Sequence, residues 1–267
     1  MTKKITAFTL VLVLSILTLI GCGAKEESGT VLKVGATPVP HSELLELVKS
    51  DLLAEGITLE IVEFTDYVTP NLALNDGEIS ANFFQHVPYM TSFSAEHKLD
   101  LVSAGTVHVE PLGLYSNTFE DIASIPVGAV IAIPNDPTNE GRALLLLQSA
   151  GLIKLKAGVS LEATDADIID NPLGLVFKPI DASQLPRTLD DVDGAVINTN
   201  YALEANLNPV EDAVILEGAD SPYANIVTVR SADLNSDAIK KLVAALQSEK
   251  VKKFIEEKYG GAVVPAF

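Results

Sequence analysis

Polar and aromatic side chains able to contact a small molecule gather in four short segments of the sequence. The segments are residues 83–89 (FFQHVPY), 134–144 (PNDPTNEGRAL), 198–202 (NTNYA) and 221–225 (SPYAN). Each lies at the end of a predicted strand or in a loop, where a rigid scaffold can point side chains into a cleft. Their amide, guanidinium, imidazole and phenol groups are suited to binding through hydrogen bonds and stacking.

Signatures of catalysis and of metal binding are absent from the sequence. It contains no nucleophile elbow, phosphate-binding loop, dinucleotide-binding glycine motif or zinc-protease motif. The four histidines, His41, His86, His97 and His108, lack close metal-ligand spacing. We therefore predict a binding protein with no enzymatic activity, no metal and no cofactor.

The composition excludes one class of partner and permits a large core. Of the 267 residues, 48% are hydrophobic, which is enough for one large domain or two smaller ones. The formal net charge is -18, with 36 acidic against 18 basic residues. Because nucleic acids bind to positive surfaces, we predict no nucleic-acid partner.

The N-terminal sequence predicts export and lipid attachment. Lys3 and Lys4 precede a run without charge over residues 5–20, which ends at Gly21 and Cys22. This pattern resembles the bacterial lipobox, so we expect residues 1–21 to be a signal peptide. Cys22 would then carry the acyl chains that hold the protein on the outer face of a cell membrane, with residues 22–30 as a tether. The alternative is an uncleaved signal anchor with an incidental cysteine.

Hydrophobic periodicity predicts an α/β protein. Apolar residues recur at helical spacing over residues 42–55 and over 236–259, the latter as one long helix or a pair. Further helices are expected at residues 70–76, 86–98, 140–150 and 201–205. Strands are expected at residues 31–36, 58–64, 79–83, 101–115 with a break at Pro111, 130–134, 193–197 and 225–230.

The order of these elements predicts two lobes. Residues 31–110 together with 224–267 are expected to form the first lobe, and residues 111–223 the second. Ligand sites in α/β proteins lie at the carboxyl ends of strands and in clefts between domains. We therefore expect the binding site in the cleft between the lobes.

The four segments resemble motifs of the NlpA/MetQ family of methionine-binding lipoproteins, which are receptors for an ABC importer. The resemblance extends to residues 107–116 (VHVEPLGLYS), 184–187 (QLPR) and 260–263 (GGAV), and so covers nearly the whole chain after Cys22. Met90, where the family usually has leucine, and Asn82 depart from its pattern. The resemblance implies a two-lobed periplasmic-binding-protein fold, type II-like, with L-methionine between the lobes. It also implies delivery to an ABC permease with its cytoplasmic ATPase.

The charged carboxylate and the thioether of methionine need different partners. The resemblance places Arg142 on the carboxylate, which a guanidinium can grip with two parallel bonds. From the residues alone, a surface ion pair of Arg142 with Glu140 or another carboxylate is the alternative. Glu110 could meet the ammonium group, although a role at the hinge or on the surface is the stronger expectation. The thioether slot is expected to be lined by Tyr67, Phe84, His86 and Tyr89.

Asparagine amides are the expected partners of the remaining polar atoms. Asn139, Asn198 and Asn225 can each donate and accept hydrogen bonds, which suits a zwitterion held without a net-charged pocket. Asn200 competes with Asn198 for the contact. Loop asparagines are also frequent turn and cap residues, so this role rests on the family motif.

Three other functions remain open to test. One keeps the class of protein and changes the ligand to a methionine-containing dipeptide or another apolar amino acid. A second is a surface adhesion lipoprotein with a degenerate pocket. The third is an amino-acid-processing enzyme, which this inventory of side chains does not favour.

Overall fold

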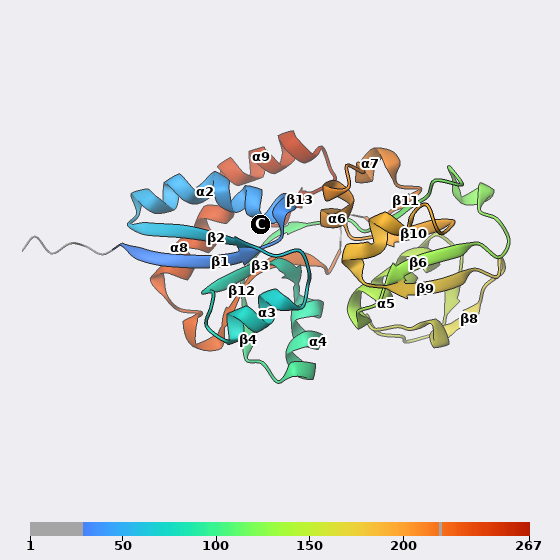
Figure 1. The fold of residues 1–267 in the computed structure, drawn as a ribbon, viewed down its shortest axis with the longest axis horizontal. Coiled ribbons are helices and arrows are strands. Elements are labelled where there is room, and N and C mark those ends of the chain that lie inside the picture. Colours follow the sequence, from blue (N-terminus) through green and yellow to red (C-terminus); the bar gives the residue numbers. More distant parts are fainter. Residues whose placement is uncertain (1–28, 219–220) are drawn as a thin grey trace, which may run out of the picture.

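The structure is a computed structural model that describes residues 29–218 and 221–267. It contains two mixed β-sheets, each with helices on both faces (Figure 1). We call each sheet with its helices a lobe. The first-lobe sheet has the order β13-β4-β12-β3-β1-β2. Its strands are β1 (Thr30–Ala36), β2 (Ile57–Glu63), β3 (Ala81–His86), β4 (Leu101–Val109), β12 (Ala224–Arg230) and β13 (Val264–Pro265).

The second-lobe sheet has the order β11-β5-β10-β6-β9. Its strands are β5 (Gly113–Tyr115), β6 (Val130–Pro134), β9 (Val176–Ile180), β10 (Gly194–Ile197) and β11 (Ile215–Leu216). A small ribbon beside it pairs β7 (Lys154–Leu155) with β8 (Ile168–Asp170). The chain passes from the first sheet to the second between β4 and β5 and returns between β11 and β12.

Helices follow most of the strands, as in other α/β proteins. Those of the first lobe are α2 (Glu43–Ala54), α3 (Thr69–Asn75), α4 (Val87–His97), α8 (Asp237–Leu246) and α9 (Glu249–Tyr259), with a short helical turn η1 (Pro38–Ser42). Those of the second are α5 (Pro137–Ser149), α6 (Thr199–Glu204) and α7 (Pro209–Asp212). Single helical turns are η2 (Ile122–Ser124), η3 (Asp165–Asp167) and η5 (Ser231–Asp233), and η4 (Ala182–Thr188) is a longer 3-10 helix.

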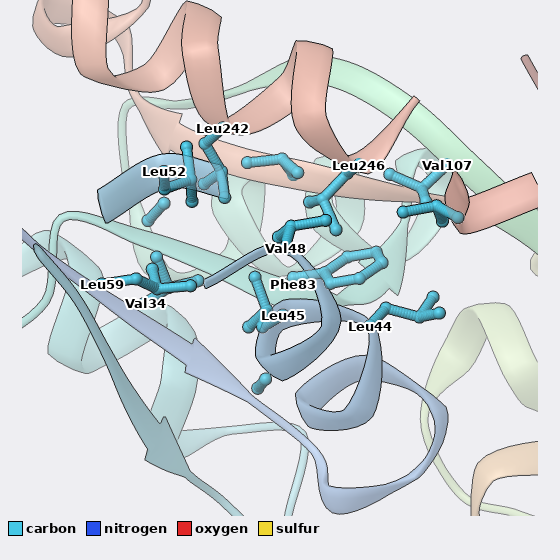
Figure 2. Packing of buried hydrophobic residues seen from close by; sticks show 14 of the residues in the cluster. Val34, Leu44, Leu45, Val48, Leu52, Leu59, Phe83, Val107, Leu242 and Leu246 are labelled. Atoms are coloured by element: carbon cyan, nitrogen blue, oxygen red, sulfur yellow. The ribbon is translucent and has the colours of Figure 1, made fainter. Parts of the chain in front are cut away.

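The main core of the first lobe lies between its sheet and α2, α8 and α9. In α2, Leu44, Val48 and Leu52 recur every four residues and are fully buried, because this spacing places them on one helix face. Figure 2 shows the side chains of α2, α8 and the sheet interleaved, with the ring of Phe83 among them. On the opposite face of the sheet, α3 and α4 cover a smaller apolar cluster.

The second lobe has one apolar cluster on each face of its sheet. Leu144 and Leu147 of α5 pack against β6, β10 and β5, and both are fully buried. Leu185 of η4 and Tyr201 of α6 pack on the other face. The lobe therefore holds α5 and α6 rigidly, which matters because both helices begin at the cleft.

Two elements differ from the sequence prediction by three residues at one end. The strand expected at residues 79–83 is β3 (Ala81–His86), whose residues are all buried, so the alternation expected of a half-exposed strand is missing. The helix expected from residue 140 begins at Pro137, because the Asp136 side chain accepts the backbone N–H of Asn139 and caps the helix. The earlier start places Asn139 and Arg142 in the first two turns of α5.

Helix length also bears on membrane crossing. Among residues 29–218 and 221–267, no helix is both long and apolar enough to span a bilayer.

Gly141 lets α5 approach the chain at residues 161–163. A Cβ atom at this position would overlap the carbonyl oxygen of Leu161 and lie 2.8 Å from the backbone nitrogen of Ala163. Backbone cannot move as freely as a side chain, so we expect Gly141→Ala to lower the free energy of unfolding by about 2 kcal/mol or more. This loss exceeds the gain of about 1 kcal/mol in helix propensity.

Urea unfolding of the two variants Gly141→Ala and Gly218→Ala measures this effect. Among the described residues, no atom lies within 4 Å of the place that a Cβ would take on Gly218, and its φ is not positive. Its replacement should therefore change the free energy of unfolding by less than about 0.5 kcal/mol. Equal stabilities of the two variants would show that α5 does not need the close approach.

Candidate functional site

A cavity lies between the two lobes. Clefts between domains are frequent sites of small-molecule binding. The first lobe and the crossing after β4 supply Tyr67, Phe84, Gln85, His86, Tyr89, Glu110 and Asn225. The second lobe supplies Asn139, Arg142, Asn198, Thr199 and Asn200. A molecule in this cavity would contact both lobes at once.

Strand ends and helix starts bring these residues together. His86 is the last residue of β3, and the antiparallel register places Asn225 of β12 opposite both His86 and His108. In the second lobe, Asn198 follows β10 and begins α6. Asn139 and Arg142 are three residues apart on α5, so they share one helix face.

Aromatic rings form the first-lobe wall. Tyr67 lies 5.8 Å from both Phe84 and Tyr89 between ring centroids, and the Tyr89 hydroxyl donates to the Tyr67 carbonyl at 2.8 Å. The Tyr67 hydroxyl donates across the cleft to Oδ1 of Asn200 at 2.6 Å. Burial raises the pKa of the Tyr67 and Tyr89 phenols, so both remain neutral donors.

Arg142 is buried and held in place from several sides. Its Nε lies 3.1 Å from Oε1 of Glu217, and Nη2 donates to Glu217 and, at 2.7 Å, to the Glu110 carbonyl. The guanidinium carbon lies 4.3 Å from the ring centroid of Tyr223. Within the described residues Nη1 has no hydrogen-bond partner, so this nitrogen is available to another acceptor. The partner carboxylate is thus Glu217, while Arg142 still lines the cavity.

Glu110 joins the two lobes at the crossing from β4 to β5. Oε1 lies 2.7 Å from Nε2 of His108 and 3.2 Å from Nε2 of His41, both in the first lobe. Oε2 accepts the backbone N–H of Asn200, in the second lobe, at 3.1 Å. Burial raises the pKa of the Glu110 carboxyl, whereas His41, Arg142 and the Asn200 N–H oppose that rise. The residue therefore has the hinge position that its sequence context suggested.

His41, His108 and Glu110 form the one group in the described part of the chain whose donor atoms are close enough for a metal ion, within 4.8 Å. The distances to the shared Glu110 oxygen are those of N–H donors to a carboxylate. Nδ1 of His108 has no partner among the described residues, whereas a metal-bound imidazole usually donates its second N–H. The geometry favours a hydrogen-bonded cluster over a metal centre.

Burial keeps three histidines neutral. It lowers the pKa of His41 to about 4 and those of His86 and His108 to about 3. The positive charge of Arg142 lowers the pKa of His86 further, and Glu110 opposes the shift of His41. The cavity wall thus carries neutral rings and amides around one buried arginine and one buried carboxyl.

A family model described as NlpA lipoprotein matches residues 32–267. The chain belongs to this family. It is similar to a solved nutrient-binding protein from Burkholderia cenocepacia bound to methionine, at 48% identity and a TM-score of 0.86 over 88% of this chain and 100% of that one. A solved periplasmic substrate-binding protein of an ABC transporter from Coxiella burnetii is 44% identical, with a TM-score of 0.85 over 88% and 100%. The D-methionine-binding lipoprotein MetQ of Salmonella typhi is 41% identical over 251 residues, 93% of each chain.

These matches decide three predictions made from the sequence. The resemblance to the NlpA/MetQ family is confirmed, and so is the two-lobed α/β fold that it implied. NlpA family members are substrate-binding lipoproteins of transport systems, and the chain is accordingly a binding protein and not an enzyme.

The structure gathers all eight residues predicted to bind ligand in the wall of one cavity. They are Tyr67, Phe84, His86, Tyr89, Asn139, Arg142, Asn198 and Asn225. Their contacts with a ligand stay a prediction. Both Asn198 and Asn200 reach the cavity, so position does not separate these two candidates.

The sequence analysis did not identify three other residues in or next to the cavity wall. Gln85 and Thr199 lie inside segments already singled out, and only their neighbours were chosen. Glu217 is 75 residues from Arg142 and follows a two-residue strand, so no local pattern could reveal the pair. Cys22 lies outside the described residues.

The lowered pKa values predict that three histidines do not become protonated at mildly acidic pH. We expect the imidazole proton shifts of His41, His86 and His108 to stay constant between about pH 8 and about pH 5, since an unshifted histidine titrates near 6.5. The unfolded chain does take up these protons, so each of the three histidines lowers the free energy of unfolding as the pH falls below about 6.5.

NMR spectra recorded across this range measure the titrations, and loss of a signal on replacing each histidine with glutamine assigns it. A midpoint above about pH 5 for any of the three would contradict the burial argument.

Proposed function

We propose that this chain captures L-methionine between its lobes and delivers it to an ABC importer. The observation that carries the proposal is the cavity, which combines a buried arginine, several amides and a wall of aromatic rings. Family membership supports it, as does the 48% identical Burkholderia cenocepacia structure, which is described as bound to methionine. MetQ of Salmonella typhi is described as a D-methionine-binding lipoprotein.

The charged ends of methionine have complementary groups in the second lobe and at β12. The carboxylate would accept from Nη1 of Arg142, a charge-assisted bond stronger than a neutral one. Asn225 would add a second donor, because its Oδ1 already faces Nε2 of His41 at 3.1 Å and its Nδ2 has no hydrogen-bond partner among the described residues. The pairing of Arg142 with Glu217 leaves little net charge to attract an anion, which favours a zwitterion.

The thioether would lie against the aromatic wall. Tyr67, Phe84 and Tyr89 form a contiguous set of rings, and contacts between sulfur and an aromatic ring contribute about 0.3 to 1.5 kcal/mol each. His86, neutral and buried, closes this wall without adding a charge. A side chain without sulfur would lose these sulfur–aromatic contacts.

Ligand capture would stabilise the closed arrangement of the lobes. Hydrogen bonds already join them, from Tyr67 to Asn200 and from the Tyr201 hydroxyl to the Thr65 carbonyl at 3.3 Å. A ligand that contacts both lobes binds the closed form better and shifts the population toward it. The closed receptor is the form that an ABC permease with its cytoplasmic ATPase would recognise.

Membrane attachment would keep the receptor near the importer. Its family is one of lipoproteins, and we propose that the lipid is carried by Cys22 on the outer face of the membrane. Two or more acyl chains hold a protein on a bilayer far more firmly than one. Mass spectrometry of the N-terminal peptide from the membrane fraction tests this directly, and an unmodified Cys22 would contradict it.

Titration calorimetry with L-methionine, D-methionine and Gly-Met tests the ligand. We expect L-methionine to bind with a Kd of about 1 μM or tighter, more tightly than the other two. Preference for Gly-Met would identify a dipeptide receptor. Absence of binding to all three, with no thermal shift, would favour a surface adhesion lipoprotein.

Asn225→Ala tests the site. The substitution removes the proposed donor to the carboxylate and an acceptor of His41, so we expect the Kd for L-methionine to rise at least about tenfold, or about 1.4 kcal/mol. Asn75→Ala is the matched control, since Asn75 is exposed at the end of α3, away from the cavity. An unchanged Kd in Asn225→Ala would refute this placement of the ligand.

A further inference from the structure

The imidazole of His86 has a defined donor and a defined acceptor nitrogen. The backbone N–H of Tyr89 donates to its Nδ1 at 3.2 Å, and a backbone N–H cannot accept. In a neutral ring the proton is then on Nε2. Nε2 lies 3.3 Å from Oδ1 of Asn139 and donates to it. The orientation of the Asn139 amide is therefore specified from the first lobe.

Asp136 specifies the same orientation from the second lobe. Its Oδ1 caps α5 by accepting the Asn139 backbone N–H at 3.0 Å. Nδ2 of Asn139 lies 3.0 Å from Oδ1 and 2.9 Å from Oδ2 of the same carboxylate. Burial raises the pKa of Asp136, and the hydrogen bonds from Asn139 and Thr138 oppose this rise and favour the accepting form. Both partners thus require Nδ2 of Asn139 to face Asp136 and Oδ1 to face away.

A hydrogen bond to Asn139 fixes the orientation of the Asn198 amide. Its Nδ2 donates to Oδ1 of Asn139 at 3.0 Å, so its own Oδ1 faces elsewhere. That oxygen is buried and has no hydrogen-bond partner among the described residues, and Asn198 itself is 7% exposed and lines the cavity. A buried acceptor without a donor costs free energy, which a donor on a bound ligand would recover.

We propose that Asp136 is a positioning residue for ligand recognition: through Asn139 it turns Oδ1 of Asn198 toward the ammonium group of the bound amino acid. The inference rests on the proposed function, because it needs a ligand with an amino group in this cavity. Asp136 itself stands behind Asn139 and does not line the cavity, so it acts only through the two amides. We call the hydrogen-bonded series Asp136, Asn139 and Asn198 the relay. It favours Asn198 over Asn200 as the partner of the ammonium group, since Oδ1 of Asn200 already accepts from Tyr67.

Asp136→Asn tests the relay while keeping a helix cap. Asparagine caps helices as well as aspartate does, but one of its two oxygens is replaced by an NH2 group, which would face Nδ2 of Asn139. Asn139 then loses one of its two acceptors on residue 136 and faces an NH2 group in its place, so its original orientation is held less firmly and Asn198 loses its fixed acceptor. Asp121→Asn is the control, because Asp121 also caps a helical turn, η2, but lies on the exposed surface away from the cavity.

The measurement is the affinity of each variant for L-methionine and for its deamino analogue, in which hydrogen replaces the ammonium group. We expect Asp136→Asn to weaken methionine about tenfold and the analogue less than about twofold, since only methionine uses the oxygen of Asn198. Asp121→Asn should bind both ligands like the unmodified protein. Thermal unfolding of each variant establishes that it is folded.

A double variant keeps the inference testable if the analogue binds too weakly to measure. If Asp136 acts through Asn198, adding Asp136→Asn to Asn198→Ala should change methionine affinity by less than about twofold. Equal losses for methionine and its analogue, or additive losses in the double variant, would overturn the relay and leave Asp136 a structural cap. If the unmodified protein binds no methionine enantiomer, it is the proposed function that fails.

Discussion

A buried carboxyl must be met by donors, and at Glu110 those donors come from both lobes. His108 and His41 reach one oxygen from the first lobe, and the backbone of Asn200 reaches the other from the second. The carbonyl of the same residue accepts from Arg142. Since an unpaired carboxylate in this position would be costly, the crossing between the sheets is held where these donors meet. The cavity lies beside this crossing, and its geometry depends on it.

Most of the other polar groups in the cavity wall are neutral. Amides and a neutral imidazole can present donors and acceptors without the desolvation cost of further charges. Their directions must then be fixed, because an amide can turn over and exchange its donor for its acceptor. Asp136 and the Tyr89 N–H supply fixed ends for one such chain. Glu110 supplies one for His41, whose Nε2 also faces Oδ1 of Asn225.

The parts of this molecule that local sequence determines could be predicted, and the parts that depend on tertiary contacts could not. The periodic leucines of α2 and the pair Asn139 and Arg142 on α5 follow from helical spacing, and the polar segments fall where strands end. The family resemblance then selected the residues predicted to bind ligand. By contrast, the Glu217 partner of Arg142 and the Glu110 cluster arise from segments far apart in the chain. Strand β3 was misplaced because a strand buried on both faces lacks alternation.

The hydrogen bonds between the lobes affect how often the lobes close without a ligand. The bonds of Tyr67 with Asn200 and of Tyr201 with the Thr65 carbonyl use only atoms of the protein, so they favour closure whether or not cargo is enclosed. Strengthening them would raise apparent affinity by enlarging the competent fraction of receptors. The same change would also enlarge the fraction of the protein that is closed while empty. These few contacts therefore set how often the protein closes without a ligand.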